Sequence, residues 1–197
     1  MNCLLTGIGG QGTVFASKLI SQSVMARGDA VRTAETIGMA QRGGSVVSHV
    51  RSGADTYSPL LAEASADVII AFEPGEAARV VRYLAPDGIM VVNSVGQQSA
   101  ADALTKKNYH PEVYLDALEK SGVSLIVING EKIAEELGSN KVLNVALVGA
   151  ACGSGKLRLD YDLLEQTIQK IAPQRFIDLN ISALKLGYKI GKSAIIT

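Results

Sequence analysis

The sequence predicts a single-domain α/β protein with three layers, in which helices cover both faces of a mostly parallel sheet. Strand-like and helix-like segments alternate along the chain, as in proteins built on parallel sheets. Hydrophobic residues make up 47% of the chain and aromatic residues only 5%, an aliphatic composition that suits strands buried on both faces. A length of 197 residues fits one large domain, so residues 1–197 are assigned to a single domain.

Apolar spacing defines the elements of the first quarter of the chain. Residues 13–26 carry apolar side chains at helical intervals, and Gly28 provides a helix stop. Residues 45–52 alternate, which places Val46 and Val50 on one face of a strand. The predicted order is a strand at 2–6, a glycine loop at 7–12, a helix at 13–26, a strand at 30–35, a polar loop at 36–45 and a strand at 45–52.

The remaining three quarters continue the alternation. Strands are expected at 68–72, 89–93 and 124–128, with a turn at Pro86–Asp87–Gly88 before the second of them. Helices are expected at 76–83, 114–120, 131–137, 141–152, 161–171 and 180–190, the last one interrupted by Gly187. The polar stretch 97–111, which includes Lys106, Lys107 and Asn108, is interpreted as a solvated surface loop.

Composition excludes several classes of function. Nineteen basic residues balance nineteen acidic ones, and a neutral chain without a Lys/Arg run is a poor binder of nucleic acid. No apolar run approaches the roughly 20 residues needed to cross a bilayer, and the first residues lack a signal-peptide pattern. We therefore expect a cytoplasmic protein. Cys3 and Cys152, expected to be buried and inert, are too few for an iron–sulfur cluster, and no metal site is expected.

The glycine loop is the first candidate site. Gly7, Gly9 and Gly12 fit the pattern G-x-G-x-x-G between a strand and a helix, which is the Rossmann dinucleotide fingerprint. Glycines let the backbone approach a phosphate, and the helix N-terminus offers free N–H groups. Glu35 ends the next strand, near the position of a ribose-binding acid. NAD or FAD binding and a tight turn without a ligand are both compatible with this pattern. A second glycine-rich segment, 149–157, departs from the P-loop pattern and is rejected.

Three segments together resemble a known family. Gly7-Ile8-Gly9-Gly10-Gln11-Gly12, the stretch from Glu35 to Ser45 (ETIGMAQRGGS) and Val46–Ser52 (VVSHVRS) resemble the gamma domain of 2-oxoacid:ferredoxin oxidoreductases. The similarity is highest to the small (beta) subunit of the indolepyruvate-specific members. Weaker likeness continues through 67–72, 90–93 and 144–149.

The resemblance implies a function shared between two subunits. These enzymes oxidatively decarboxylate an aryl-pyruvate with CoA to an aryl-acetyl-CoA, CO₂ and reduced ferredoxin. In the family, thiamine diphosphate, its magnesium ion and the iron–sulfur clusters belong to a large subunit, so this chain is expected to hold no cofactor and to be inactive alone. The expected partners are that large subunit and, for the complex, ferredoxin as electron acceptor. CoA is the expected small-molecule contact, and a homodimer is expected for the chain in isolation, with the 36–45 loop at or near the interface.

Residue types in the matched segments indicate which positions bind a ligand. Arg42 stands in a loop of small residues, where a guanidinium binds a phosphate or carboxylate through two hydrogen bonds; an ordinary surface ion pair is the alternative. No residue is assigned to catalysis. The predicted cofactor-binding or substrate-binding set is Gly7, Gly9, Gly10, Gln11, Gly12, Thr13, Arg42, Gly43, Gly44 and Ser45.

Five further polar residues lie in or near the predicted strands and loops. Glu35 is interpreted either as a salt-bridge partner of Arg42 or as a residue facing the partner's active site. His49, in mid-strand, is interpreted as structural, and His110 lies in a polar loop. Asn93 and Ser94 are expected to line the cleft at the carboxyl edge of the sheet.

Two other functions remain open from the sequence. A free-standing NAD(P)-dependent reductase would use the same glycine loop, although no recognisable hydride-transfer constellation accompanies that loop. A non-catalytic subunit retained for assembly is the third possibility.

Overall fold

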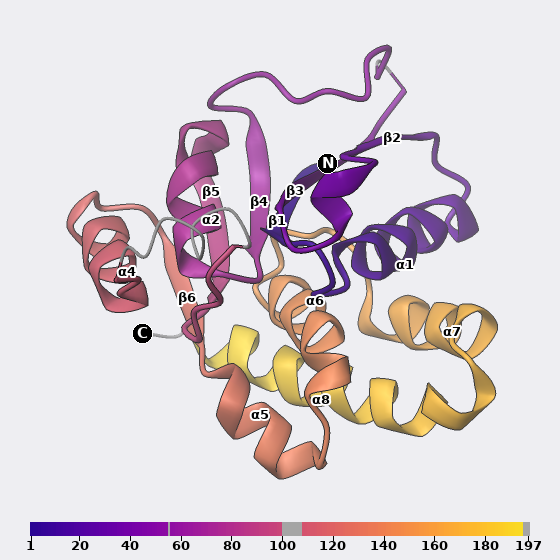
Figure 1. Cartoon of the computed structure of the whole chain (residues 1–197). Coiled ribbons are helices and arrows are strands. Elements are labelled where there is room, and N and C mark those ends of the chain that lie inside the picture. The colour runs from indigo at the N-terminus through magenta and orange to yellow at the C-terminus, as the bar shows by residue number, and fades with distance from the viewer. Residues whose placement is uncertain (55, 100–107, 195–197) are drawn as a thin grey trace.

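A computed structural model describes residues 1–54, 56–99 and 108–194, and in this part of the chain six strands form one sheet (Figure 1). The strand order is β2-β3-β1-β4-β5-β6. The strands are β1 (Asn2–Ile8), β2 (Val31–Glu35), β3 (Ser45–Ser52), β4 (Ala66–Ala71), β5 (Leu84–Asn93) and β6 (Leu125–Ile128).

The sheet is mostly parallel, as predicted. β1, β4, β5 and β6 are consecutive parallel neighbours, with Leu5 beside Ile70 and Ile70 beside Val91. β3 alone runs in the opposite direction, because it pairs antiparallel with both β1 and β2. β2 therefore runs parallel to β1 but is separated from it by β3.

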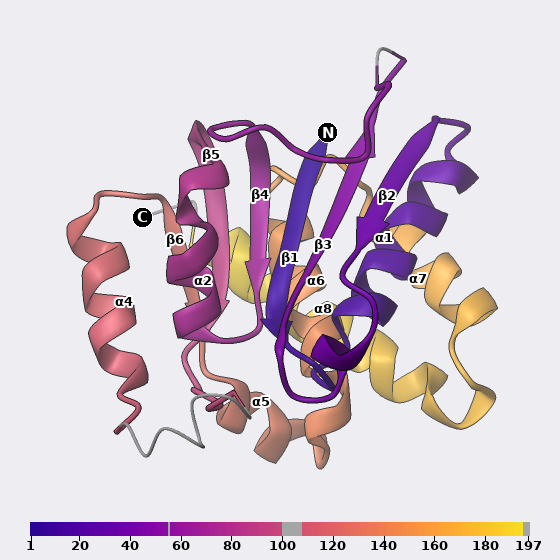
Figure 2. The ribbon, with the colours of Figure 1, turned by 45° about the horizontal axis from the view of Figure 1, so that its top comes forward.

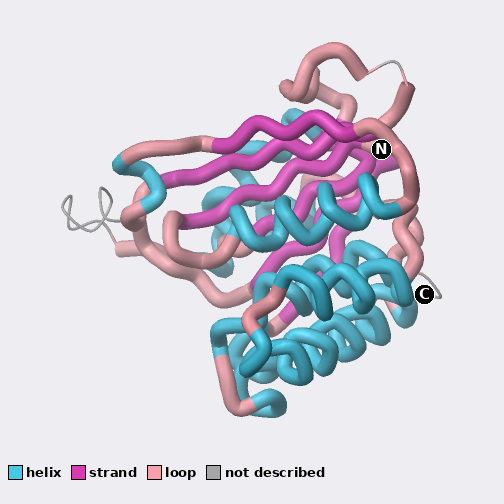
Figure 3. Tube along the Cα trace, turned by 90° about the vertical axis from the view of Figure 1, so that its right-hand side faces the viewer, coloured by secondary structure: helices cyan, strands magenta, loops and turns pink. Residues whose placement is uncertain are grey.

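Helices cover both faces of the sheet and give the predicted three layers (Figures 2 and 3). α2 and α4 lie on one face, whereas α1, α6, α7 and α8 form the layer on the other face, and α5 lies near the carboxyl ends of the strands. The helices are α1 (Thr13–Ala26), α2 (Pro74–Val80), α4 (Pro111–Lys120), α5 (Gly130–Leu137), α6 (Leu143–Gly153), α7 (Tyr161–Ile171) and α8 (Ile177–Ser193). Short 3₁₀ turns occupy Met39–Gln41, Val81–Tyr83, Asn140–Val142 and Gln174–Phe176.

Two hydrophobic cores form because successive strand residues point to opposite faces. Leu5 and Ile70 join the larger core, with apolar residues of α1, α6, α7 and α8. Leu4 and Ile69 join the smaller core, with residues of α2 and Leu118 of α4. Burial on both faces explains the unbroken apolar runs in the central strands.

Gly187 does not interrupt a helix, so that expectation was wrong. α8 runs without a break through Gly187, which lies against α6. A Cβ at Gly187 would collide with the carbonyl oxygen of Ala146, and one at Gly191 would collide with that of Ala150. The glycines permit close packing of two helices rather than a break in one of them.

Other differences concern element ends. Pro86–Asp87–Gly88, expected as a turn, lies within β5, where the pairing with β4 shifts between Ala66 and Val68. The helix expected at 76–83 is α2, which starts earlier at Pro74 because the Glu73 side chain accepts the Glu76 N–H and caps it. In the rejected P-loop segment, α6 ends at Gly153, as the sequence indicated.

Lys106 and Lys107 lie outside the described residues, and Asn108 is exposed. Among the helices of the described ranges, none combines the length and apolar character required to cross a membrane.

Candidate functional site

A cavity of about 520 Å³ lies at the carboxyl edge of the sheet. α1 follows β1 onto one face and α2 follows β4 onto the other, so the neighbouring strands β1 and β4 form a topological switch point. Open α/β sheets bind ligands at this place. The lining residues come from the segments that follow the parallel strands and from the start of α6: Gly10, Gln11, Gly12, Phe72, Asn93, Val95, Gly96, Gln97, Gly130, Glu131, Ala134, Asn140, Lys141, Leu143 and Asn144.

The glycine loop forms one wall and leads directly into α1. Gly10 has φ 104° and Gly12 has φ 88°, backbone conformations that other L-residues adopt only with strain. Gly12 is the N-cap of α1, and this helix has no side-chain cap and no acidic residue in its first turn. The first N–H groups of an α-helix have no intrahelical acceptor, and the helix dipole makes this end electropositive. The wall therefore favours an anion.

Gln11 holds the glycine loop to the neighbouring strands. Its Oε1 accepts the N–H of Ile8 at 2.7 Å. Its Nε2 donates to the Phe72 carbonyl oxygen at 3.5 Å and to Gln97 Oε1 at 3.2 Å. The amide thus links the ends of β1 and β4 to the segment after β5, and its role is to shape the cavity.

Asn93, expected to line the cleft, does so and connects three segments. Its Nδ2 donates to the carbonyl oxygens of Phe72 and Val95, both at 3.1 Å. Its Oδ1 accepts the N–H of Gly130 at 3.0 Å, at the start of α5. Each polar atom of this buried amide is used to fix the floor of the cavity. Ser94 is partly exposed next to it and is not among the lining residues.

Asn144 and Lys141 were not singled out from the sequence. Asn144 Nδ2 donates to the Gly12 carbonyl oxygen at 3.3 Å, and a Cβ on Gly12 would meet this side chain. Lys141 and Glu131 add one basic and one acidic residue to the lining, and the Lys141 Nζ lies 5.9 Å from the centroid of the Phe176 ring. The one signal in the sequence was an Asn inside an otherwise apolar helix, a position that requires hydrogen-bond partners.

The 36–45 loop packs behind the glycine loop. The Gly9 N–H donates to the Gly44 carbonyl oxygen at 2.8 Å, and a Cβ on Gly9 would collide with the backbone of Ala40 and Gln41. The structure therefore brings the two predicted glycine segments together. Arg42, Gly43, Gly44 and Ser45, however, are not among the residues that line the cavity.

The predicted site residues thus differ in their position relative to the cavity. Gly10, Gln11 and Gly12 line the cavity, whereas Gly7, Gly9 and Thr13 support its wall. Arg42 is exposed, and its side chain makes no hydrogen bond or ion pair with any described residue. Ser45 Oγ donates to Glu76 Oε2 at 2.5 Å, so it connects β3 to α2.

Glu35 does not pair with Arg42, so that interpretation was wrong. Glu35 Oε1 instead accepts the Ser17 hydroxyl at 2.5 Å, which ties β2 to α1. In the dinucleotide fingerprint, the acid ends the parallel strand next to β1. Here the antiparallel β3 occupies that place, so the geometry disfavours the NAD alternative.

The histidines have structural contacts. His49 Nδ1 accepts the Leu61 N–H at 3.2 Å, and its ring meets that of Tyr83 edge-on with centroids 6.1 Å apart. Burial, assisted by the nearby Arg51, lowers the pKa of His49, which keeps the ring neutral. His110 contacts Glu112 at the surface.

The described residues do not fit an iron–sulfur cluster or a metal ion. Cys3 and Cys152 are both buried, and burial raises the pKa of the Cys3 thiol and raises that of Cys152 to about 12. Thiols in such surroundings stay protonated and are poor ligands. Within the described ranges, no three His, Cys, Asp or Glu side chains are grouped to hold a metal.

Comparison with known proteins connects this site to a family. The family model of pyruvate ferredoxin/flavodoxin oxidoreductase matches residues 2–190. Indolepyruvate oxidoreductase subunit IorB of Archaeoglobus fulgidus is 38% identical over 189 residues, which cover 95% of this chain and 94% of that protein.

Two solved structures share the fold. The gamma subunit of a keto/oxoacid ferredoxin oxidoreductase from Geobacter sulfurreducens has a TM-score of 0.71 at 18% identity, over 98% of both chains. A 2-oxoglutarate:ferredoxin oxidoreductase from Magnetococcus marinus, with 2-oxoglutarate, coenzyme A and succinyl-CoA bound, has a TM-score of 0.72 at 19% identity. That match covers 98% of this chain and 31% of the longer one. The resemblance inferred from the glycine segments is confirmed, and the chain belongs to the pyruvate ferredoxin/flavodoxin oxidoreductase family.

Proposed function

We propose that the chain is the small subunit of a 2-oxoacid:ferredoxin oxidoreductase that acts on indolepyruvate or a similar aryl-pyruvate, and that its glycine-loop cavity binds the diphosphate of coenzyme A. One observation carries the ligand assignment: the cavity at the switch point is lined by Gly10, Gln11 and Gly12, and Gly12 is the N-cap of α1, which has no side-chain cap. The relative from A. fulgidus, named an indolepyruvate oxidoreductase subunit, supports the substrate class.

The charges around the cavity suit a diphosphate. The N-terminus of α1 presents N–H donors, and Lys141 adds a cation from the start of α6. Glu131 on α5 is the one acidic side chain among the described residues that line it. A ligand phosphate placed between α1 and Lys141 would be attracted from two sides, and Gly10 leaves open space for its approach.

The redox chemistry is assigned to the partner. Thiamine diphosphate with its magnesium ion, and the iron–sulfur clusters, would be held by a large subunit, which passes electrons to ferredoxin. This chain would orient CoA and cover the site, so that the acyl group meets the thiol in a space closed to water. An assembly subunit without ligand contacts is the remaining alternative, and it predicts that CoA does not bind here.

Co-expression and ligand titration test the proposal. We expect the chain to co-purify with a large cysteine-rich subunit, and the complex to bind CoA but not NADH in calorimetric titration. Lys141→Ala should weaken CoA binding about tenfold or more, because a charged hydrogen bond contributes roughly 1.5–3 kcal/mol. Lys170→Ala, which removes an exposed cation on α7, serves as the control. Equal CoA affinity in parent and Lys141→Ala would refute the placement, and NADH binding would favour the reductase.

A further inference from the structure

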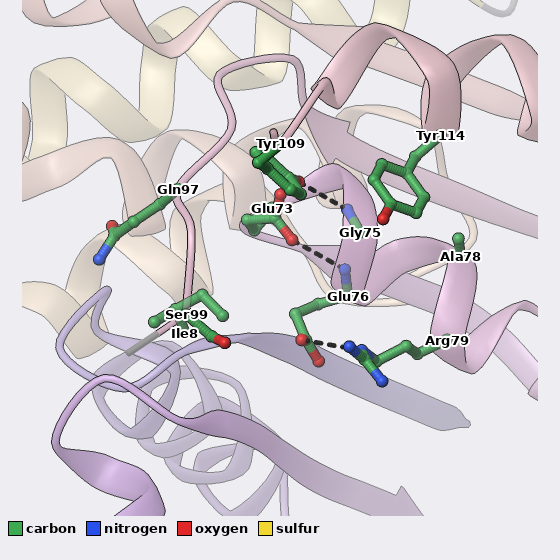
Figure 4. Close-up of a pocket in the computed structure, with 10 residues that line it drawn as sticks. All are labelled: Ile8, Glu73, Gly75, Glu76, Ala78, Arg79, Gln97, Ser99, Tyr109 and Tyr114. Carbon is green, nitrogen blue, oxygen red and sulfur yellow. Dashed lines mark hydrogen bonds and ion pairs between the residues drawn. The ribbon is translucent and has the colours of Figure 1, made fainter. Parts of the chain in front are cut away.

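A second cavity, of about 360 Å³, lies beside α2 and α4 and is distinct from the glycine-loop wall (Figure 4). Among the described residues, Gln97 alone lines both cavities. The volume of this second cavity is near the lower end of the roughly 300–1,000 Å³ typical of ligand pockets. It therefore suits a small molecule.

The charge of this cavity is not balanced among its described lining residues. Glu76 is satisfied, because Oε2 accepts the Ser45 hydroxyl at 2.5 Å and Oε1 pairs with Arg79 Nε at 3.2 Å. Glu73 has no such cation within the described part of the chain. Its Oε2 accepts the Glu76 N–H at 2.8 Å, while Oε1, buried with the rest of this 2%-exposed residue, has no hydrogen-bond partner among the described residues.

A buried carboxylate oxygen without a partner is energetically unfavourable. Leaving such a group unsatisfied costs about 1–3 kcal/mol, and more when it is charged. Burial is the main cause that raises the pKa of Glu73, although the nearby N–H groups of Glu76, Gly75 and Gln97 lower it in part. A cation bound in the cavity would offset this cost, because it would stabilise the charged form of the carboxyl group.

Two tyrosines form the wall next to it. The rings of Tyr109 and Tyr114 are stacked, with centroids 5.6 Å apart and planes at 25°. Tyr109 Oη accepts the Gly75 N–H at 3.2 Å, and a Cβ built on Gly75 would lie 3.1 Å from Glu73 Oε2 and 3.2 Å from Tyr109 Oη. Figure 4 shows the Glu73 carboxylate beside the Tyr109 ring. An anion next to aromatic faces is the combination that recognises an organic cation.

We propose that this cavity is a binding site for a small organic ammonium ion, whose charge is attracted by the Glu73 carboxylate while its carbon body packs against Tyr109 and Tyr114. A metal ion fits less well, because it needs several oxygen ligands and both oxygens of Glu76 are already occupied. The proposal is independent of the oxidoreductase assignment, since it uses neither the glycine loop nor Lys141.

Titration calorimetry of the full chain at pH 7.5 with three ligands of one shape tests the proposal. The ligands are phenethylamine (a cation), 2-phenylethanol (neutral) and 3-phenylpropionate (an anion). We expect phenethylamine to bind about tenfold tighter than the alcohol, and the carboxylate not to bind. Glu73→Gln, which retains an acceptor for the helix cap, should abolish this tenfold preference. Glu63→Gln, an exposed glutamate paired with Arg82, should keep it.

Two further measurements distinguish a loss of ligand binding from misfolding of the Glu73→Gln variant. Circular dichroism checks that Glu73→Gln is folded, and Tyr114→Leu should weaken the amine and the alcohol together. If phenethylamine does not bind at millimolar concentration, binds no better than the alcohol, or binds the folded Glu73→Gln variant equally well, the proposal is wrong.

Discussion

Replacing Arg42 by Ala should separate function from stability. The Arg42 guanidinium is exposed and makes no hydrogen bond or ion pair with a described residue, although the loop that carries it packs tightly behind Gly9. A cation held at the carboxyl edge of the sheet without an internal partner is available to an external anion. We predict that this anion belongs to CoA or to a carboxylate of the large subunit, and that Arg42 binds it through two hydrogen bonds.

Arg51 provides a matched control for the size of the change in folding stability. It lies next to the last residue of β3, at the opposite edge of the sheet, and its side chain donates to Asn2 Oδ1 at 3.0 Å and to the carbonyl oxygens of Ser58 and Leu60 at 2.8 and 3.0 Å. Each such bond contributes roughly 0.5–1.5 kcal/mol net, so the loss of all three in Arg51→Ala should cost about 1.5–4.5 kcal/mol of stability. Arg42→Ala should lose less than about 0.5 kcal/mol, since it removes no contact within the described residues.

Two assays read the outcome. In thermal unfolding, Arg51→Ala should melt several degrees below the parent, because about 1 kcal/mol corresponds to roughly 2–4 °C in a chain of this size, and Arg42→Ala should melt within about 2 °C. In the reconstituted complex, Arg42→Ala should lose about ten- to a hundredfold in kcat/KM, as expected for a lost charged hydrogen bond. Arg42→Lys should restore part of it, because an ammonium lacks the planar fork. A large drop in melting temperature with normal turnover would refute the reasoning.

The remaining predictions concern single positions. Gly10→Ala and Gly28→Ala both place a Cβ in open space at positive φ (104° and 90°), so each should lower the free energy of unfolding by about 1–2 kcal/mol. Only the Gly10 variant should weaken CoA binding. Equal CoA affinity in the two variants would show that the glycine loop is merely a turn. Gly187→Ala should lose roughly 1–3 kcal/mol in chemical denaturation, because its Cβ would collide with the Ala146 carbonyl oxygen; unchanged stability would contradict the close helix crossing. Met39→Ser should reduce self-association or binding to the large subunit, because Met39 is 78% exposed; a parent that is strictly monomeric by light scattering would contradict the expected homodimer.

Local periodicity was sufficient for most of the elements. α1 and α7 begin and end where the spacing of apolar residues predicted, and β3 alternates between buried and half-buried residues. Strand order is different, because it depends on pairing between distant segments. Nothing in residues 30–52 indicates that β3 inserts between β1 and β2, and this insertion is what separates Glu35 from the position of a ribose-binding acid.

The candidate site could be predicted only in part, because it also depends on contacts between segments that are distant in the sequence. Gly10, Gln11 and Gly12 form a contiguous motif and are visible in the sequence. Asn144 and Lys141 reach the cavity only after the chain has completed the sheet, so no local pattern places them beside Gly12.

The antiparallel β3 also explains why one edge of the molecule combines a cavity with an exposed loop. β2 runs parallel to β1, so the connection from β2 back to β3 must turn at the carboxyl edge, where Ile8 lies opposite Ser45. This turn is the 36–45 loop, and it exposes Ile37 by 79% and Met39 by 78% next to the glycine loop. Apolar side chains this exposed are typical of surfaces that bind another protein. A partner docked on this loop would border the ligand cavity, which is the arrangement a subunit needs if it orients a substrate for chemistry performed on another chain.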